Sequence, residues 1–197
     1  MPFAYPVFLE LEGKRVVVIG TAALAEGKDR ALREAGASVD VFEDGAWSAS
    51  DLEGAFVCVA SSDDPVERYR IARACRERGV LVNVMDDVPN CDFAAPAVVR
   101  RGDLVIAIST GGRSPAVARK VREDLERRFG DEWAEVLAVV AEVRAQTSPR
   151  TADLAMRAKR WRRALDLDEA VQLVREGRPD ELRRRLTERV LAQEVPA

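Results

Sequence analysis

The sequence predicts an α/β fold in which a parallel sheet with helices comes first and helices alone follow. Up to residue 109, short apolar runs rich in β-branched residues alternate with helical segments, which is the order of a parallel sheet with crossover helices. From Pro115 onward Ala, Leu, Arg and Glu dominate, and apolar residues recur three or four positions apart. The chain has 197 residues, of which 47% are hydrophobic and 33% charged, so it can bury a core of ordinary globular size.

The first part of the chain contains four apolar runs that predict parallel strands, and a fifth follows them. The first is RVVVI at 15–19, which stops at Gly20, and continuous apolar runs of this kind are typical of strands buried on both faces. The other runs are 39–42, 55–60, 80–84 and 104–109. Helices predicted over 22–35 and 65–78 supply right-handed crossovers, so we expect a doubly wound sheet.

The remaining elements are a hairpin and a series of helices. Only residues 101–103 separate two strand-like runs, which predicts a hairpin at the far edge of the sheet. Helices are predicted at 115–129, 131–147, 151–164, 168–176 and 179–192, with Asp131, Thr151 and Asp168 as N-caps and a hinge at Ser148-Pro149. The predicted domains are therefore 1–112 for the α/β domain, 113–148 for a helical dimerisation region and 149–197 for a small C-terminal helical domain.

Composition excludes several classes of chemistry. The chain has no histidine, so it has no Ser-His-Asp or Cys-His catalysis and no HExxH zinc site. Cys58, Cys75 and Cys91 are an odd number without a CxxC pair, which argues against a disulfide framework or a structural zinc site, and we expect no metal site and a cytoplasmic location. The net charge is −3 and no apolar run reaches membrane-spanning length, so neither a nucleic acid nor a membrane is an expected partner.

The turn after the first strand, in VVVIGTAALAEGK, occupies the position of a dinucleotide-binding fingerprint. In that fingerprint glycines let the backbone approach the pyrophosphate, and the helix N-terminus offers free N–H groups. Gly20 is present, but Ala22 stands where the second glycine belongs, and its methyl group crowds the point of closest approach to phosphate. A cofactor site and a tight turn in a Rossmann-like fold without a cofactor are equally open at this point.

If a cofactor binds, its contacts can be assigned to three turns at one edge of the sheet. Glu43 and Asp44 end the second strand at the spacing of a ribose-binding carboxylate, and they favour NAD over NADP because a 2′-phosphate would meet like charge. Ser62 follows the third strand on the same side, in a cluster that also resembles an ordinary N-cap. The predicted NAD-binding residues are Gly20, Ala22, Ala23, Leu24, Glu43, Asp44 and Ser62.

Several stretches in combination resemble the precorrin-2 dehydrogenase/sirohydrochlorin ferrochelatase family, which includes the N-terminal module of sirohaem synthases. They are YPVFLELEGKRVVVIG, VCVASSDDPVERYRIARACRERGVLVNVMDD, CDFAAPAVVRRGDLVIAISTGGRSPAVARKVREDLE and the helical tail. The resemblance implies a homodimer that binds NAD through a Rossmann domain and oxidises precorrin-2 to sirohydrochlorin in sirohaem biosynthesis. Some members of the family also insert ferrous iron into the product.

The resemblance assigns one catalytic residue, because the aspartate implicated in both activities of the family matches Asp86. The chemistry suits a carboxylate at the carboxyl end of a strand, since oxidation and chelation both require protons to leave the macrocycle. Asp87 is the competing residue, and its alternative role is to cap or hydrogen-bond the loop that leads to Pro89.

A second segment is predicted to bind the substrate, which carries eight carboxylates. The residues are Ser109, Thr110, Gly111, Gly112, Arg113 and Ser114. The two glycines let the backbone pass close to a ligand, and Ser114 is a candidate N-cap before Pro115, where the helix N-terminus favours an anion. The alternative is a capped strand-to-helix turn without a ligand.

Two departures from the family pattern leave the function open. One is Ala22, and the other is the short connection 44–54, where relatives have a longer segment with an additional strand. We therefore hypothesise weakened NAD binding. The alternatives to a dehydrogenase are a non-redox tetrapyrrole-binding or chelatase-only member of the family and an unrelated Rossmann sensor subunit. The apolar stripe AEVLAVVAEV within 115–147 predicts a dimer interface, with an intramolecular core as the alternative.

Overall fold

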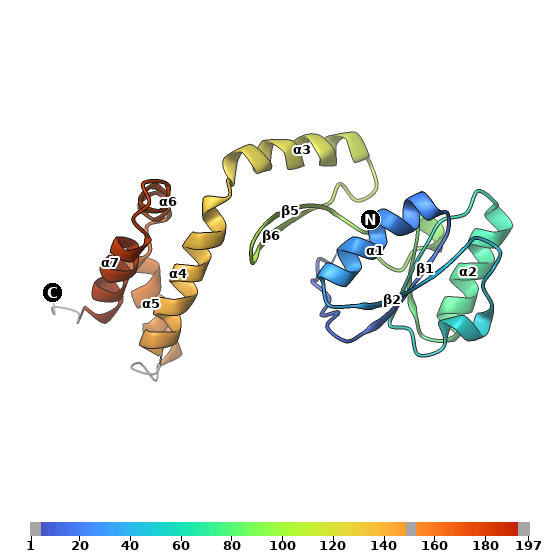
Figure 1. The fold of residues 1–197 in the computed structure, drawn as a ribbon, viewed down its shortest axis with the longest axis horizontal. Coiled ribbons are helices and arrows are strands. Elements are labelled where there is room, and N and C mark those ends of the chain that lie inside the picture. Colours follow the sequence, from blue (N-terminus) through green and yellow to red (C-terminus); the bar gives the residue numbers. More distant parts are fainter. Residues whose placement is uncertain (1–4, 149–152, 193–197) are drawn as a thin grey trace. The chain divides into compact units, whose positions relative to one another are not determined.

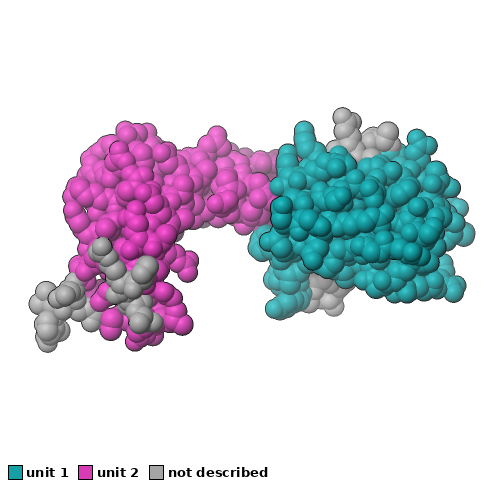
Figure 2. All heavy atoms as spheres, turned by 60° about the horizontal axis from the view of Figure 1, so that its bottom comes forward, with its two compact units in different colours: residues 1–96, 109–115 teal, residues 97–108, 116–197 magenta. Residues whose placement is uncertain are grey.

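The computed structural model describes residues 5–148 and 153–192, and within residues 22–26 it describes the backbone only. The chain forms two compact units (Figure 2). Unit 1 contains residues up to Pro96 together with Ser109–Pro115, and unit 2 contains Ala97–Ile108 and the residues after Pro115. The grouping places the hairpin region with the helices, and the predicted division into three domains stays a prediction.

Unit 1 is a four-stranded parallel sheet with helices, as the sequence predicts (Figure 1). Its elements are β1 (Arg15–Ile19), α1 (Ala22–Glu34), β2 (Ser38–Phe42), β3 (Val57–Ala60), α2 (Pro65–Glu77) and β4 (Leu81–Val84). The strand order is β2-β1-β3-β4, and every pair is parallel. The carboxyl ends of all four strands therefore meet at one edge, where ligands bind in open α/β sheets.

The sheet is buried on both faces because β1 alternates between two clusters of apolar side chains. Val17 and Ile19 belong to the cluster that contains α2, whereas Val16 and Val18 belong to a second cluster against which Leu32 of α1 packs. Val16, Val17, Val18 and Ile19 are all fully buried. A run of β-branched residues without polar alternation is the pattern of such a central strand.

The short connection between β2 and β3 is anchored in the core of unit 1. It contains a single 3-10 turn, η1 (Ala49–Leu52), and the side chains of Leu52 and Trp47 are buried. The Trp47 indole N–H donates to Glu67 Oε1 at 2.6 Å, and the Arg70 guanidinium lies 4.5 Å from the centre of the indole ring. An aromatic anchor with a satisfied N–H thus replaces a longer crossover element.

Unit 2 begins with a hairpin and continues with five described helices. The strands are β5 (Ala97–Arg101) and β6 (Leu104–Ile108), which pair antiparallel. The helices are α3 (Pro115–Arg128), α4 (Glu132–Thr147), α5 (Leu154–Ala164), α6 (Leu167–Arg175) and α7 (Pro179–Leu191). The core of the helical part consists of Val136, Val139 and Val143 of α4 with apolar side chains of α6 and α7.

The predicted hairpin is confirmed, but its predicted place at the edge of the parallel sheet is wrong. β5 and β6 form a two-stranded sheet of their own. The turn between them packs on α4, since a Cβ on Gly102 would lie 2.9 Å from Cβ of Ala134, and the guanidinium of Arg101 donates to the carbonyl of Glu126 in α3 at 3.3 Å. These contacts, rather than hydrogen bonds to β4, hold the hairpin.

One of the predicted helix caps is wrong, and another is confirmed in position without a capping side-chain bond. The N-cap of α6 is Asp166, whose carboxylate accepts from the N–H groups of Asp168 and Glu169 at 3.0 and 3.1 Å, so the prediction of Asp168 is wrong. Asp131 occupies the N-cap position of α4 but makes no side-chain cap bond. The predicted cap Thr151 and Pro149 of the predicted hinge lie outside the described residues.

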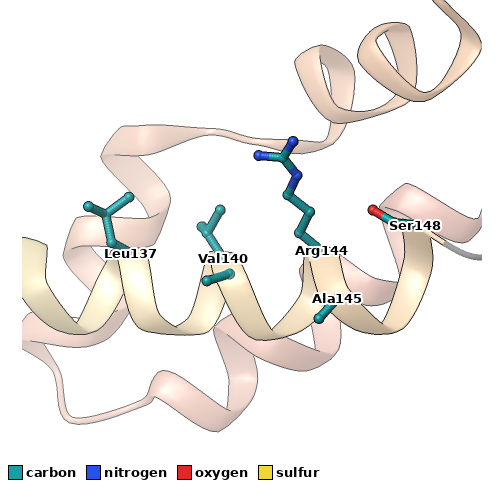
Figure 3. A pocket seen from close by; sticks show the side chains of 6 residues that line it. Leu137, Val140, Arg144, Ala145 and Ser148 are labelled. Atoms are coloured by element: carbon teal, nitrogen blue, oxygen red, sulfur yellow. The ribbon is translucent and has the colours of Figure 1, made fainter. Parts of the chain in front are cut away.

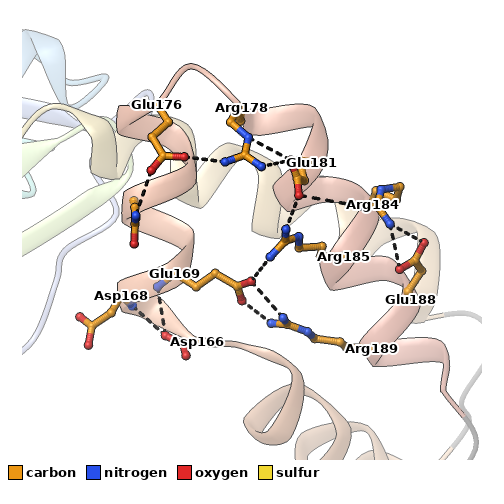
Figure 4. Close-up of polar contacts among 11 residues, drawn as sticks. Asp166, Asp168, Glu169, Glu176, Arg178, Glu181, Arg184, Arg185, Glu188 and Arg189 are labelled. Carbon is orange, nitrogen blue, oxygen red and sulfur yellow. Dashed lines mark hydrogen bonds and ion pairs between the residues drawn. The ribbon is translucent and has the colours of Figure 1, made fainter.

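Ion pairs join α6 to α7 on the surface of unit 2 (Figure 4). Glu169 of α6 accepts from Arg185 and Arg189 of α7, and Glu181 accepts from Arg178 and Arg185. Arg189 and Arg185 lower the pKa of the Glu169 carboxyl by hydrogen bonding and charge. The interleaved acids and bases of the second half therefore pair with each other in the described helices, in agreement with their helical spacing in the sequence.

Candidate functional site

The candidate site lies at the carboxyl edge of the sheet in unit 1. Four loops meet there, one after each parallel strand, and the segment Ser109–Pro115 belongs to the same unit. The residues predicted to bind NAD lie on these loops or on the first turn of α1, and the residues predicted to bind substrate lie on the segment after β6. Asp86 and the predicted NAD contacts therefore share one edge of the sheet.

The loop after β1 has the backbone geometry of an anion-binding turn. Gly20 has φ of +153°, a conformation that a side chain disfavours, and its N–H donates to the carbonyl of Phe42 at 3.0 Å. Thr21 is the N-cap of α1 and makes no side-chain cap bond. Ala22, Ala23 and Leu24 form the first turn, whose backbone N–H groups are the donors a pyrophosphate needs.

The loops after β2 and β3 carry the other residues predicted to bind NAD. Glu43 and Asp44 are exposed directly after β2. The hydrogen bond from Arg70 to Glu67, and to a smaller extent the negative charges of Glu67 and Asp44, raise the pKa of the Arg70 guanidinium. Ser62 is buried, and its hydroxyl oxygen accepts from the N–H of Asp64 at 3.2 Å, so it organises the turn into α2.

Asp86 lies in a tight turn directly after β4. The N–H of Asp87 donates to the carbonyl of Val84 at 3.2 Å, which closes a four-residue turn with Asp86 at its third position. Asp86 has φ of +59°, and among the described residues it is the only non-glycine with positive φ. Its side chain is exposed and makes no hydrogen bond or ion pair within the described parts of the chain. The carboxylate is thus available to a ligand.

Asp87 is engaged within the protein. Its Oδ2 atom accepts from Nε of Arg68 at 2.9 Å and from Nδ2 of Asn90 at 3.0 Å. Asn90 and Arg68 together hold the pKa of the Asp87 carboxyl below its usual value, against a smaller opposing effect of burial. These bonds fit the loop-stabilising role considered for Asp87, and they leave Asp86 as the available carboxylate of the pair.

The segment after β6 returns to unit 1 beside this turn. Gly111 and Gly112 have φ of +61° and +77°, and a Cβ on Gly112 would lie 3.7 Å from Cγ2 of Val88, two residues beyond Asp86. The Thr110 hydroxyl accepts from the N–H of Ser114 at 3.2 Å and donates to its carbonyl at 3.2 Å. The structure therefore brings the glycine segment against the loop that follows the catalytic candidate.

The remaining predicted substrate residues frame this glycine pair. The Ser109 hydroxyl accepts from the N–H of Gly111 at 3.1 Å, and Arg113 is exposed. Because the Gly111 N–H is taken by Ser109, the left-handed conformation of the glycine pair leaves the N–H of the exposed Gly112 close to the surface. Such a segment can bind carboxylates through its backbone and through Arg113.

Sequence reasoning missed two residues that organise the site. Arg68 on α2 links the loop after β3 to Asp87, since its Nη1 atom donates to the carbonyl of Ser62 at 2.8 Å. The Cys91 thiol donates to the carbonyl of Val84 at 3.0 Å and accepts from the N–H of the same residue at 3.2 Å. Neither residue belongs to a motif that predicts these contacts, because the contacts depend on how α2 packs beside β4.

A hollow of about 430 Å³ lies elsewhere, on the surface of α4 in unit 2 (Figure 3). Its lining residues are Leu137, Val140, Ala141, Arg144, Ala145 and Ser148. The described residues contain no cluster of three or more cysteine, aspartate or glutamate side chains that could hold a metal ion. None of the described helices is both long and apolar enough to cross a membrane.

Comparisons with known proteins cover nearly the whole chain. The family described as "Putative NAD(P)-binding" matches residues 7–97, and "Sirohaem biosynthesis protein central" matches residues 101–128. Siroheme synthase 1 of Aeromonas salmonicida is 29% identical over 191 residues, which cover 87% of this chain and 41% of the relative. Siroheme synthase of Methylococcus capsulatus is 30% identical over 214 residues, which cover 98% of this chain and 45% of the relative.

The fold is also found among solved structures. SirC, a precorrin-2 dehydrogenase, superposes with a TM-score of 0.73 at 20% identity, covering 93% of this chain and 99% of that chain. The chain spans less than half the length of the siroheme synthases it matches. The two family models follow one another along the chain and the siroheme synthases align across both, so the chain is similar to sirohaem synthases over nearly its whole length, while the likeness to SirC shows the fold.

Proposed function

We propose that the protein is an oxidoreductase that oxidises precorrin-2 to sirohydrochlorin with NAD in sirohaem biosynthesis. The observation that carries the proposal is Asp86, an exposed carboxylate without a partner in the described chain, held at the carboxyl edge of the sheet in a backbone conformation that favours glycine. The similarity to sirohaem synthases and the glycine segment beside the same loop support the assignment of substrate.

The residues at the β1 turn fit a nicotinamide dinucleotide. The N–H groups at the start of α1 would bind the pyrophosphate next to Gly20, and Ser62 would lie on the nicotinamide side of the edge. Glu43 and Asp44 would bind the ribose hydroxyls and repel a 2′-phosphate, so NAD is the proposed cofactor over NADP. When bound, NAD accepts a hydride from the substrate.

In the proposed mechanism the protein binds the macrocycle and receives its proton. The Gly112 N–H and the Arg113 guanidinium bind substrate carboxylates, in a segment whose shape is set by the bonds of the Thr110 hydroxyl to Ser114 and of the Gly111 N–H to Ser109. Loss of one hydride and one proton converts precorrin-2 to sirohydrochlorin, and Asp86 takes the proton as general base. The same carboxylate can receive pyrrole protons when ferrous iron enters the product, so iron insertion is a proposed second activity.

The test is an anaerobic assay of sirohydrochlorin formation from precorrin-2 with NAD, followed by addition of ferrous iron or cobalt. We expect Asp86→Ala to lower the rate by about 10² to 10⁴-fold, as for loss of a general base. Asp103→Ala is the control, because Asp103 is an exposed aspartate of the hairpin. An unchanged rate in Asp86→Ala contradicts the catalytic assignment.

A second candidate function is a tetrapyrrole-binding or chelatase-only member with weakened NAD binding. It is favoured by Ala22 in the phosphate turn and by the short η1 connection, where Trp47 and Leu52 fill the core in place of an additional strand. Calorimetric titration with NAD and NADP distinguishes this candidate from the proposed dehydrogenase. Binding of NAD in the low-micromolar range contradicts weakened binding, and tighter binding of NADP than NAD contradicts the roles of Glu43 and Asp44.

A homodimer is proposed on the basis of unit 2. None of the residues of α3 is buried within the chain, and its Val117 and Val121 are exposed one turn apart. The outward face of α4 carries the apolar hollow of Figure 3. A cytoplasmic location is proposed because Cys58 and Cys75 are buried free thiols that a reducing compartment keeps unpaired.

A further inference from the structure

The conformation of Asp86 requires a restraint from outside its own side chain. The third position of a turn with positive φ favours glycine, and an aspartate there is commonly supported by a bond from its carboxylate to nearby backbone. Asp86 has φ of +59°, and its carboxylate makes no such bond within the described chain. Neighbouring groups must therefore hold the turn in place.

The restraint acts on the next residue, Asp87. Its carboxylate accepts from Arg68 Nε at 2.9 Å and from Asn90 Nδ2 at 3.0 Å. Its carbonyl accepts from the Asn90 N–H at 3.0 Å and from the Cys91 thiol at 3.3 Å. Asp87 is thus fixed through both its side chain and its backbone, which leaves the preceding residue little freedom to rotate.

Arg68 connects this restraint to a second loop. Its Nη1 atom donates to the carbonyls of Ser62 and Asp63 at 2.8 and 3.3 Å, while its Nε atom holds Asp87. The loop 61–64 lies on the cofactor side of the sheet edge. The side chains of Arg68 and Asp87 are only 24% and 16% exposed, so their contact is shielded from water more than the Arg73–Glu77 pair of α2. A planar guanidinium can span two loops in a way that an ammonium group cannot.

We propose that Arg68 and Asp87 are positioning residues, which fix the Asp86 carboxylate relative to the loop 61–64 and hence relative to the bound nicotinamide. The inference rests on the proposed function for its reaction, and on the contacts above for its geometry. Displacement of a reacting group by about 1 Å can lower a rate by about 10²-fold. Loss of either residue therefore acts on the chemical step, although neither residue touches the substrate.

The experiment compares two ion pairs of the same helix. Arg68→Gln and Asp87→Asn remove the proposed pair, and Arg73→Gln and Glu77→Gln remove the exposed pair of Arg73 and Glu77, whose atoms lie 2.7 Å apart. We expect Arg68→Gln and Asp87→Asn to lower kcat by about 10 to 100-fold, with less than a threefold change in the KM for NAD or for precorrin-2. The double variant is expected to be no slower than either single variant, because both act on the same contact. The control variants stay within about twofold of the wild type.

Three further outcomes make the test decisive. Unchanged kcat in Arg68→Gln and Asp87→Asn, in an active wild type, overturns the positioning role and leaves the proposed function intact. Equal changes in kcat and both KM values, together with a large fall in Tm, also overturn it, because they indicate a general structural role. If Arg68→Gln does not fold, Arg68→Lys keeps the charge but cannot span both loops, and the same fall in kcat is expected.

A readout without turnover separates this inference from the proposed function. The N–H groups of Met85 and Asp87 bond to the carbonyls of Ala60 and Val84 at 2.8 and 3.2 Å, on either side of Asp86. We expect their hydrogen exchange to be at least about tenfold faster in Arg68→Lys than in Arg73→Lys. If the wild type is inactive but exchange is faster in Arg68→Lys than in Arg73→Lys, the proposed function alone is refuted. If exchange is the same in the two variants, the positioning role is refuted.

Discussion

Asp86 combines an available carboxylate with a backbone conformation that costs stability. In the left-handed region the Cβ atom lies too close to the backbone, a penalty of about 1 kcal/mol for a side chain other than glycine. The structure keeps the aspartate there although a glycine fits the turn better. Under the proposed function, the requirement for a carboxylate at this residue outweighs local stability, as is common at functional sites.

Asp86→Gly is therefore expected to stabilise the protein while it abolishes activity. Relief of the left-handed penalty exceeds the entropic cost of glycine, so we expect the free energy of unfolding to rise by about 0.5 kcal/mol and Tm by about 1 to 2 °C. The control is Asp63→Gly, because Asp63 is exposed and does not have positive φ, and glycine there lowers Tm. Calorimetry of both variants gives the sign of each change in Tm, and a Tm of Asp86→Gly below that of the wild type contradicts the assignment of backbone strain to Asp86.

Asp87 predicts a pH dependence of stability. Its pKa in the folded chain lies below the unfolded value of about 3.9, so the unfolded chain binds more protons in acid. The stability that Asp87 contributes is therefore fully present above about pH 5 and is lost as the pH falls through the folded pKa. The wild type should exceed Asp87→Asn in unfolding free energy at pH 7, and the difference should shrink steadily below about pH 4. Urea unfolding of both proteins at several pH values measures this difference in unfolding free energy, and a difference that does not change with pH contradicts the prediction.

At the scale of elements, periodicity predicted most of the architecture. The described strands and helices lie within a few residues of their predicted ranges, because buried parallel strands and amphipathic helices leave clear patterns. The place of the hairpin was not predictable, since it depends on the contact of Gly102 with Ala134 rather than on its own sequence. The cap of α6 was misassigned because Asp166 and Asp168 both have a suitable side chain, and only backbone dihedrals distinguish them.

The corrected cap of α6 gives a direct test. Asp166→Ala removes two hydrogen bonds to the first turn and is expected to lower the free energy of unfolding of unit 2 by about 1 kcal/mol. Asp168→Ala removes only a favourable interaction with the helix dipole, worth about 0.3 to 0.5 kcal/mol. Thermal unfolding of the two variants compares them, and an equal or greater loss in Asp168→Ala contradicts the assignment of the cap.

At the scale of the whole molecule, the site is assembled from distant parts of the chain. The turn at Asp86 and the segment 109–115 belong to unit 1, although the hairpin between them belongs to unit 2. The sequence motifs predicted that the loops with Asp86 and with the two glycines carry chemistry, and the structure brings these two loops together, while their chemical roles stay a prediction. They did not predict Arg68, because its role arises from the packing of α2 between the ends of β3 and β4.

The helix α4 carries the remaining whole-molecule prediction, which concerns the proposed dimer. One apolar face of α4, with Val136, Val139 and Val143, packs on α6 and α7. A second face carries the surface hollow that Ala141 and Ala145 help to line. The apolar stripe in the sequence thus includes an intramolecular core and a second, outward face. A stable dimer buries about 800 Å² per partner, which is more than one helix face supplies, so the exposed stripe of α3 is expected to contribute.

Ala141→Arg is expected to convert the dimer to a monomer without loss of folding. Ala141 is exposed within the chain, so arginine disturbs no intramolecular core, but in a dimer it would bury an unpaired charge. The matched control is Gln146→Arg, which places the same charge on a different, exposed face of α4 and should leave the dimer intact. Light scattering after size-exclusion chromatography gives the masses, and circular dichroism checks folding. A wild type that is monomeric at micromolar concentrations, or an Ala141→Arg variant that remains dimeric, contradicts an interface built on this face of α4.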